Sequence, residues 1–308
     1  MIFIITHKED FTADYIVDKL NAASIEYHRF NCEDIQSNGY EFQIGEKTTT
    51  LISKISKIDS VWFRRTKLPN LNIDTLSEAE RHHLLSEYDA LLSNIYHLID
   101  ARRWMSIPNN VYLAENKLLQ LKMATQLGFE TPETLVTSDK NSLKSFAIKH
   151  DHDLIIKPLD QGRINDANGI KNIFTNQLKK EHLDNIDEFT LTPSIFQPRI
   201  RKEFELRITV IGDKVFVAKV DSQIKEETKV DWRKQKLKFI KYDLPPDISY
   251  KCVELVKNLG LSFGAIDMIK SKNGEFVFLE INPNGQWAWI EFDTGLAISD
   301  EIINFLNI

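Results

Sequence analysis

Three side chains with oxygen atoms lie near the C-terminal end of the sequence. Asp267 is in the apolar run Gly264–Lys270, and Glu280 and Asn282 are in the next run. Because side chains at positions i and i+2 point to the same face of a strand, Glu280 and Asn282 should point the same way. Two carboxylates and an amide oxygen are ligands suited to Mg²⁺. For Asn282 alone, a turn beginning with Pro283 is the simpler interpretation, but for the three residues together a metal site is favoured.

Two lysines nearer the middle of the chain could meet an anion. Lys157 directly follows the apolar residues 154–156, and a buried ammonium group is costly unless it is paired with a negative charge. The loop that follows, Gln161-Gly162-Arg163, has a glycine that would let backbone N–H groups approach phosphate. Lys117 falls in the first turn of a predicted helix, a position that favours phosphate. Each lysine alone could equally belong to a solvated face.

A third group of candidates follows a strand predicted at Ser194–Gln197. The link Gln197-Pro198-Arg199-Ile200 offers backbone groups that could bind the edge of an adenine. Glu205 and Arg207 alternate on the next predicted strand and share a face, so the carboxylate could bind a ribose diol and the guanidinium phosphate oxygens. The alternative is an exposed ion pair on a sheet surface, which stabilises little.

The first part of the chain, which helps to position these residues, has the pattern of a small α/β domain. Met1–Ile5 predicts a buried strand, Ala13–Leu20 a helix, and Leu76–Arg102 one long helix or two. These patterns favour a doubly wound α/β domain over residues 1–105. Pro108, followed by two asparagines, indicates a domain boundary there.

Beyond the boundary the pattern becomes richer in strands. Glu115–Leu127 predicts a helix that Gly128 ends. The apolar runs that contain Asp267 and Glu280 are joined by an Asn-Gly turn, which is typical of a hairpin. Residues 221–246 are polar, rich in lysine and poorly periodic, and we expect a mobile loop there.

Composition and charge limit the possible functions. The chain has 308 residues and a formal net charge of −6, which argues against non-specific nucleic-acid binding. The charge is uneven, because residues 197–241 carry a net +6 that could receive an anionic ligand, although a solvated face would look the same. The longest apolar run, Met1–Ile5, is too short to span a membrane. Two distant cysteines, Cys32 and Cys252, fit a reducing cytoplasm.

Taken in order, these residues resemble the ATP-grasp superfamily over about residues 105–308. The nearer resemblance is to RimK-like carboxylate ligases, and within them to ATP-grasp maturases of ribosomal peptides, the microviridin-type or graspetide macrocyclases. The segments that carry this closer resemblance are Trp62-Phe63-Arg64-Arg65, Asp221-Ser222-Gln223, Asp231-Trp232-Arg233 and Glu280–Trp287. The hinge departs from the pattern, with Pro198 where relatives often have Glu, so the adenine amine would depend on backbone carbonyls.

The resemblance implies an α/β and α+β architecture. A doubly wound α/β domain (1–105) would precede an ATP-grasp fold with a central subdomain (106–192) and a C-terminal subdomain (193–308). Asp267, Glu280 and Asn282 would hold two Mg²⁺ ions, and Lys117 and Lys157 would hold the α- and β-phosphates of ATP. The hinge residues Gln197, Pro198, Arg199 and Ile200 would bind adenine, and Glu205 would bind the ribose.

The resemblance also implies a reaction. ATP would activate Asp or Glu side chains of a precursor peptide as acyl phosphates, and Thr or Ser hydroxyls or Lys amines would then close ester or amide rings. Arg207 and Arg233 would act on the reacting phosphoryl and carboxylate groups, while Arg65, Asp231 and Lys234 would contact the peptide. The partners would be an acidic peptide and, as a possibility, a second copy of the chain, with no nucleic acid and no membrane. The alternative is a ligase that adds an amino acid to a protein tail or small metabolite.

Overall fold

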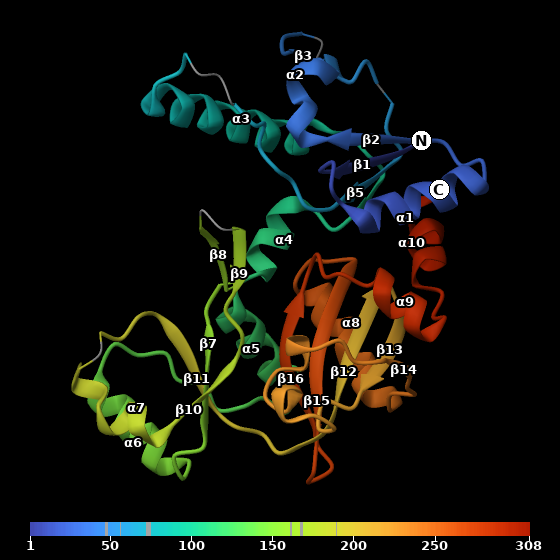
Figure 1. Ribbon diagram of the computed structural model, residues 1–308. Coiled ribbons are helices and arrows are strands. Elements are labelled where there is room, and N and C mark those ends of the chain that lie inside the picture. The colour runs from blue at the N-terminus through green and yellow to red at the C-terminus, as the bar shows by residue number, and fades with distance from the viewer. Residues whose placement is uncertain (47–48, 56, 72–74, 161, 167–168, 189) are drawn as a thin grey trace.

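The computed structural model contains three main sheets that follow one another along the chain (Figure 1). It describes residues 1–46, 49–55, 57–71, 75–160, 162–166, 169–188 and 190–308. Gln161, part of the predicted phosphate loop, lies outside the described residues. Within the described ranges, no helix is long and apolar enough to cross a membrane.

The N-terminal domain is a parallel sheet with a helix on each face. Its strand order is β2-β1-β5-β6, and every neighbouring pair is parallel. Even positions of β1 pack with helix α1 and odd positions pack with helix α3, so both faces are covered, as parallel sheets require. The doubly wound domain predicted from the sequence is therefore confirmed. The elements are β1 (Ile2–Thr6), α1 (Phe11–Ala22), β2 (Tyr27–Asn31), α2 (Ile35–Asn38), β3 (Tyr40–Gln43), β4 (Thr49–Ile52), β5 (Ser60–Phe63), α3 (Glu78–Leu98) and β6 (Arg103–Met105).

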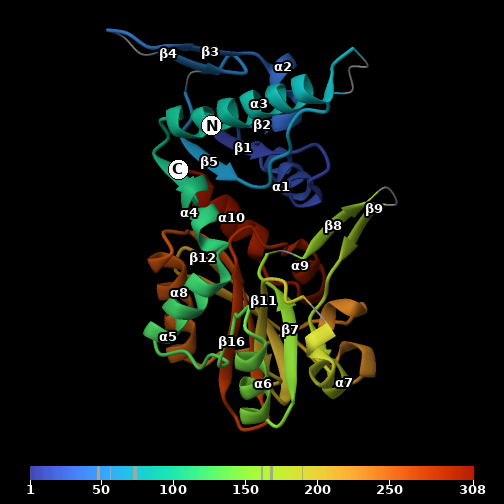
Figure 2. The same ribbon diagram turned by 90° about the vertical axis from the view of Figure 1, so that its left-hand side faces the viewer.

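The central sheet is small and antiparallel, with the order β10-β7-β11. Hairpin β8–β9 extends from it on the side of the N-terminal domain (Figure 2). The sequence-based boundary after residue 192 would assign β11 to the C-terminal unit, whereas its pairing joins it to this central sheet. The elements are α6 (Lys140–Lys149), β7 (Leu154–Pro158), β8 (Arg163–Asp166), β9 (Gly169–Asn172), β10 (Asn176–Leu178), α7 (Lys180–Asp184) and β11 (Ser194–Pro198).

The C-terminal sheet has the order β14-β13-β12-β15-β16 and is antiparallel throughout. Leu206, Ile208 and Val210 on β12 join the core that contains helix α8. Because side chains alternate along a strand, Glu205 and Arg207 lie on the opposite face. The elements are β12 (Lys202–Ile211), β13 (Lys214–Val220), β14 (Ile240–Lys241), α8 (Pro246–Asn258), β15 (Phe263–Ser271), β16 (Phe276–Asn282), α9 (Ala288–Thr294) and α10 (Ile298–Leu306).

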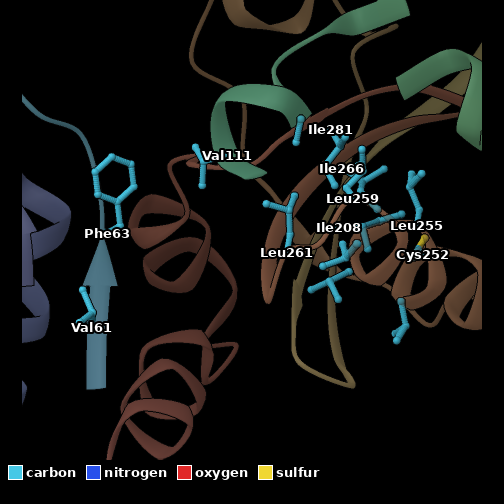
Figure 3. Close-up of a cluster of buried hydrophobic side chains, with 14 of the residues drawn as sticks. Val61, Phe63, Val111, Ile208, Cys252, Leu255, Leu259, Leu261, Ile266 and Ile281 are labelled. Carbon is cyan, nitrogen blue, oxygen red and sulfur yellow. The ribbon is translucent and has the colours of Figure 1, made fainter. Parts of the chain in front are cut away.

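Two helices join the N-terminal domain to the C-terminal sheet. They are α4 (Pro108–Ala114) and α5 (Lys117–Gln126), where the sequence predicted a boundary and then one helix over 115–127. Pro108 occupies the first turn of α4, where its missing N–H costs nothing, so it begins a helix here. Val111 on α4 lies between Phe63 on β5 and Ile281 on β16 (Figure 3). The two domains therefore share a continuous hydrophobic core.

The segment 221–246, for which the sequence predicted a mobile loop, has local structure. It contains two short 3-10 helices, Glu226–Thr228 and Trp232–Lys234, and strand β14. The Trp232 ring lies 5.2 Å from the Phe239 ring and 5.5 Å from the Trp289 ring, measured between centroids. These aromatic contacts hold the segment against helix α9, and a local sequence pattern does not reveal them.

Candidate active site

Three charged residues form a row across neighbouring strands of the C-terminal sheet. Arg207 on β12 is opposite Asp267 on β15, and Asp267 is opposite Glu280 on β16. Directly opposite residues of antiparallel strands point to the same face. The row therefore lies on the face away from α8. Asn282 lies on the same face as Glu280, as the alternation in the sequence predicted.

The row is electrostatically linked. Arg207 Nη1 donates to both carboxylate oxygens of Asp267, each at 3.0 Å. Burial raises the pKa of Asp267, Arg207 opposes this, and the neighbouring Glu280 raises it further. Burial would also raise the pKa of Glu280, but Lys157 and Lys117 hold it below its usual value. Glu280 is therefore the carboxylate that stays charged most easily.

The oxygen atoms of this face fit a magnesium site. Among the described residues no hydrogen bond is donated to the half-buried Glu280 carboxylate, whose ion pair with Lys117 spans 3.7 Å, so its oxygens have capacity for a cation. Asn282 Oδ1 accepts the backbone N–H of Asn284 at 3.1 Å and keeps a second lone pair. In the described ranges no three His, Cys, Asp or Glu residues cluster as metal ligands, so a cation here would use two carboxylates, the Asn282 amide and non-protein oxygens.

Two lysines face the carboxylates from outside the sheet. Lys117 begins α5, whose N-cap Asn116 accepts the backbone N–H of Leu119. Its ammonium lies 3.7 Å from Glu280 Oε2 and donates to the backbone carbonyls of Pro158, the last residue of β7, and Asp160 in the loop that follows. Lys157 on β7 is buried, which lowers its pKa, while Glu280 opposes that change. Both lysines are placed to meet anionic oxygens.

The hinge between β11 and β12 is only partly available to a ligand. Gln197 is buried and donates to Thr134 Oγ1 at 2.8 Å. Arg199 donates to Asp153 through its backbone N–H, at 2.8 Å, and through two side-chain nitrogens. Pro198 has no N–H, so Ile200 is the hinge residue whose N–H has no bonded partner in the described part of the chain. The sequence suggested that the backbone groups of the hinge could bind adenine. Of its backbone N–H groups, Ile200 therefore offers the one that is available to a ligand in the described part of the chain.

A buried ion pair lies beside the hinge. Lys202 Nζ donates to Glu205 Oε1 at 3.0 Å and to the Val230 carbonyl at 2.9 Å. Burial raises the pKa of Glu205, and Lys202 opposes that shift. Sequence reasoning missed Lys202, although a lysine three residues before a glutamate at the start of a strand was visible.

Most of the residues singled out in the sequence line one cavity, here called the first cavity. It includes Lys117, Lys157, Gln197, Pro198, Arg199, Ile200, Glu205, Asp231, Arg233, Asp267 and Glu280. A second cavity of about 370 Å³ adjoins it at Lys117, Arg233 and Glu280, and it adds Asn282 and Arg65. Lys234 lines neither of these cavities, and its ammonium donates to Asn176 Oδ1 at 3.3 Å.

Asp231 and Arg233 form a pair at the mouth of the first cavity. Arg233 donates to Asp231 through its backbone N–H at 3.1 Å and through its side chain at 2.8 and 2.6 Å. Burial would raise the pKa of Asp231, but Arg233 holds it below its usual value. The pair fixes the Arg233 guanidinium where the two cavities meet.

The loop after β16 ties the site to the N-terminal domain, a connection that sequence reasoning missed. Thr12 Oγ1 donates to Gln286 Oε1 at 2.5 Å, and the Gln286 carbonyl accepts Arg207 Nη2 at 3.4 Å. Asn284 Nδ2 donates to the carbonyl of Arg64 at 3.2 Å. The Arg64 side chain is itself buried against Asp10, with a closest distance of 3.2 Å.

Comparisons with known proteins agree with this geometry. A family model described as a RimK-like ATP-grasp domain matches residues 114–306. The chain is 29% identical over 103 residues to a probable alpha-L-glutamate ligase 2 of Shewanella denitrificans, which is 33% of this chain and 34% of that protein. The chain thus matches only about a third of the length of such curated relatives.

Two solved structures are similar over nearly the whole chain. One is a RiPP-associated ATP-grasp ligase of Chryseobacterium gregarium in complex with ADP and a leader and core peptide, with 30% identity, TM-score 0.89, and coverage of 99% of this chain and 96% of that one. The other is the macrocyclase MdnC of Microcystis aeruginosa bound with precursor peptide MdnA, with 29% identity, TM-score 0.87 and 99% coverage of both chains.

Proposed function

The chain belongs to the RimK-like ATP-grasp family of ligases, and from that membership we propose that it closes rings in a ribosomally made precursor peptide. An Asp or Glu side chain of the peptide attacks the γ-phosphorus of ATP, ADP leaves, and an acyl phosphate forms. A Thr or Ser hydroxyl or a Lys amine then displaces phosphate to give an ester or an amide. The Arg207–Asp267–Glu280 row, flanked by Lys117 and Lys157, is the observation that carries this proposal.

Each group of residues has a proposed role in the first step. Phosphoryl transfer needs positioning and charge neutralisation more than covalent help from the protein. Lys117 and Lys157 neutralise the α- and β-phosphates of ATP. Arg207, whose buried Nε has no partner among the described residues, stabilises the transferring phosphoryl group or the acyl phosphate.

The metal and nucleotide sites follow the same logic. Asp267, Glu280 and Asn282 would hold two Mg²⁺ ions, which supply positive charge to the phosphate oxygens. The Ile200 N–H and the carbonyls of the hinge, Gln197-Pro198-Arg199-Ile200, bind the adenine edge. Glu205, held by Lys202, binds the ribose diol. The ADP in the Chryseobacterium structure supports a nucleotide in the first cavity.

The peptide is proposed to enter through the second cavity. Arg65 and Arg233 line this cavity and would attract the substrate carboxylate, and Asp231 holds Arg233 in place. Lys234 lies outside both cavities, so its proposed contact is with acidic residues further along the peptide. Replacing Lys234 together with Lys236 and Lys238 by Ala should weaken peptide binding at low salt, measured by fluorescence anisotropy. Unchanged affinity would remove these lysines from the binding surface.

The remaining partners are also proposals. The complexes of the two similar structures with peptides support a peptide partner here. We also propose that the core of this peptide is acidic, and that the chain forms a homodimer, which light scattering would measure. Both cysteines are buried and free, which supports a cytoplasmic location. The three-unit division at residues 105 and 192 remains a proposal that limited proteolysis would test.

Mass spectrometry tests the function directly. The substrate is a synthetic peptide with the sequence of a short reading frame beside the gene that repeats Thr, Ser or Lys with Asp or Glu. With enzyme, ATP and Mg²⁺, each ring should remove one water from the peptide. Glu280→Gln should abolish ring formation, whereas Glu275→Gln, an exposed residue of the same hairpin, should not. Ring formation by Glu280→Gln at the wild-type rate would contradict the assignment of the site.

A second function has one observation in its favour. The partial match to probable alpha-L-glutamate ligases supports a ligase that adds a free amino acid to a protein tail or metabolite. The two functions share the ATP site and differ in their products. A product that gains the mass of an amino acid residue would favour this second function, and loss of water from one peptide would favour ring closure.

A further inference from the structure

The cavities beyond the ATP site contain a carboxylate that none of the roles above uses. The second cavity adjoins a third, of about 290 Å³, which reaches the carboxyl end of β5. Arg65, Glu115 and Asn282 line both. Glu115 therefore lies on the side of the metal-ligand candidates that faces away from the hinge, where the acceptor of the acyl group would have to enter.

The backbone around Glu115 is held on both sides. Glu115 is the C-cap of α4, with its N–H donating to the Val111 carbonyl at 3.1 Å. Asn116 follows as the N-cap of α5, and Lys117 begins that helix. The backbone of Glu115, two residues before Lys117 and between two helices, therefore has a fixed position relative to that lysine.

The second cavity has two kinds of charge. Arg65 and Arg233 suit a carboxylate, whereas Glu115 and Asp160 suit a group that donates a hydrogen bond. Two reacting side chains of one peptide, an acid and a nucleophile, would therefore meet complementary groups in the same space. Glu115 is an exposed residue, but partial burial of its carboxylate raises its pKa, Asp160 raises the pKa further, and Arg65 opposes both effects.

The other groups that could take a proton are less suitable. In the described part of the chain no histidine or cysteine lines the second or third cavity. Glu280 is engaged by the two lysines, and the pKa of Tyr112 is raised by burial and by nearby carboxylates. Asp160 lines only the second cavity, and its backbone carbonyl accepts Lys117.

We propose that Glu115 is the general base of the second step and binds the acceptor hydroxyl, or the acceptor amine in its neutral form. This inference rests on the proposed ring-closing function. The acceptor oxygen or nitrogen forms a bond to the acyl carbon, and its proton passes to a Glu115 oxygen. The bond between the acyl carbon and the phosphate oxygen breaks, and its electron pair leaves with phosphate.

Hydroxylamine separates the two steps because it traps an acyl phosphate without needing a protein base. Wild type, Glu115→Gln and Glu203→Gln, an exposed residue of β12, are each given ATP, Mg²⁺ and the synthetic peptide defined above, with and without hydroxylamine. Rings and peptide hydroxamate are counted by mass. In Glu115→Gln the rate of ring closure should fall about 100-fold relative to hydroxamate formation. Glu203→Gln should keep the wild-type ratio.

The outcomes distinguish the two proposals. An unchanged ratio of rings to hydroxamate in Glu115→Gln would overturn the base assignment while leaving ring closure in place. Equal loss of both products would assign Glu115 to the first step and also overturn it. A wild-type enzyme that forms neither product from the peptide would refute the proposed function, and the inference would fall with it. Partial recovery of ring closure in Glu115→Asp would support the carboxylate as the proton acceptor.

Discussion

Replacement of Gly285 by alanine is a sharp test of how the loop after β16 positions the active site. An added Cβ would lie 2.5 Å from Ala265 Cβ, 2.7 Å from Arg207 Nη2 and 3.3 Å from Asn282 Cβ. Carbon atoms in contact are normally about 3.5–4.0 Å apart, so the loop or its neighbours must move by about 1 Å. Ala265 is fully buried on β15 and cannot yield. The movement must therefore fall on Arg207 or on the loop itself.

Both of those movements damage the site. Arg207 is held by Asp267 on one side and by the Gln286 carbonyl on the other, and Asn282 is a proposed metal ligand. A misplacement of about 1 Å at catalytic groups can cost about 100-fold in rate. Overpacking of this kind destabilises the fold by about 1–3 kcal/mol. We therefore expect the kcat for ADP formation to fall about 100-fold, with a folded protein of reduced unfolding free energy.

The assay measures ADP release by a coupled reaction and the unfolding free energy by urea titration. Gly45→Ala is the matched control, because an added Cβ there has no atom within 4 Å. If Gly285→Ala kept a kcat within two-fold of wild type, the loop would not position Arg207. If its kcat fell but Gly45→Ala fell equally, the loss would not be due to the close approach at Arg207.

Three further predictions use other buried charges. Arg64→Met leaves Asp10 buried without its partner and should lower the unfolding free energy by about 3–5 kcal/mol in urea titrations; no change would exclude a structural role for the pair. Burial would raise the pKa of Asp10, but Arg64 and Thr6 hold it below its usual value, so this group stabilises the fold above about pH 4 and the contribution is lost as the pH falls further. The unfolding free energy of Asp10→Asn should consequently vary less with pH below about pH 4 than that of wild type. The same dependence of unfolding free energy on pH in both proteins would refute this. Lys202→Met removes the partner of buried Glu205. Calorimetric titration should show a Kd for ATP raised about ten-fold, a loss of binding free energy near 1.4 kcal/mol. An unchanged Kd would contradict the proposed contact between Glu205 and the ribose.

Much of the site was predictable because strand geometry is regular. Glu280 and Asn282 share a face by simple alternation, and the Asn-Gly turn predicted the hairpin. The exact pairing of Asp267 with Glu280 also needs a register shift between Asp267 and Met268, which the sequence pattern does not show. The positions of Lys157 at a strand end and Lys117 at a helix start followed from equally local signals. Lys117, Lys157, Asp267 and Glu280 line the first cavity, Asn282 lines the adjoining second cavity, and the chemical roles of all five remain proposals.

Other features depend on contacts that no local pattern contains. Pro108 was interpreted as a domain boundary, and the sequence pattern did not show that it begins helix α4, whose Val111 packs between two domains. Residues 221–246 were expected to form a mobile loop, because the sequence pattern does not show the contact of Trp232 with Trp289, which joins segments far apart in the chain. The place of Glu115 in the second cavity depends on the same distant packing, so sequence reasoning assigned it only to a helix.

The contacts between the N-terminal domain and the loop after β16 have a consequence for protein engineering. Thr12 is hydrogen-bonded to Gln286, and Asn284 is hydrogen-bonded to the Arg64 backbone, so segments more than 200 residues apart form one joint between the N-terminal domain and the loop. A chimaera that exchanges residues 1–105 between relatives would combine mismatched halves of this joint. Transplanting residues 283–287 together with the N-terminal domain should preserve it. The part of this enzyme that can be exchanged as a unit therefore consists of two segments that are far apart in the gene.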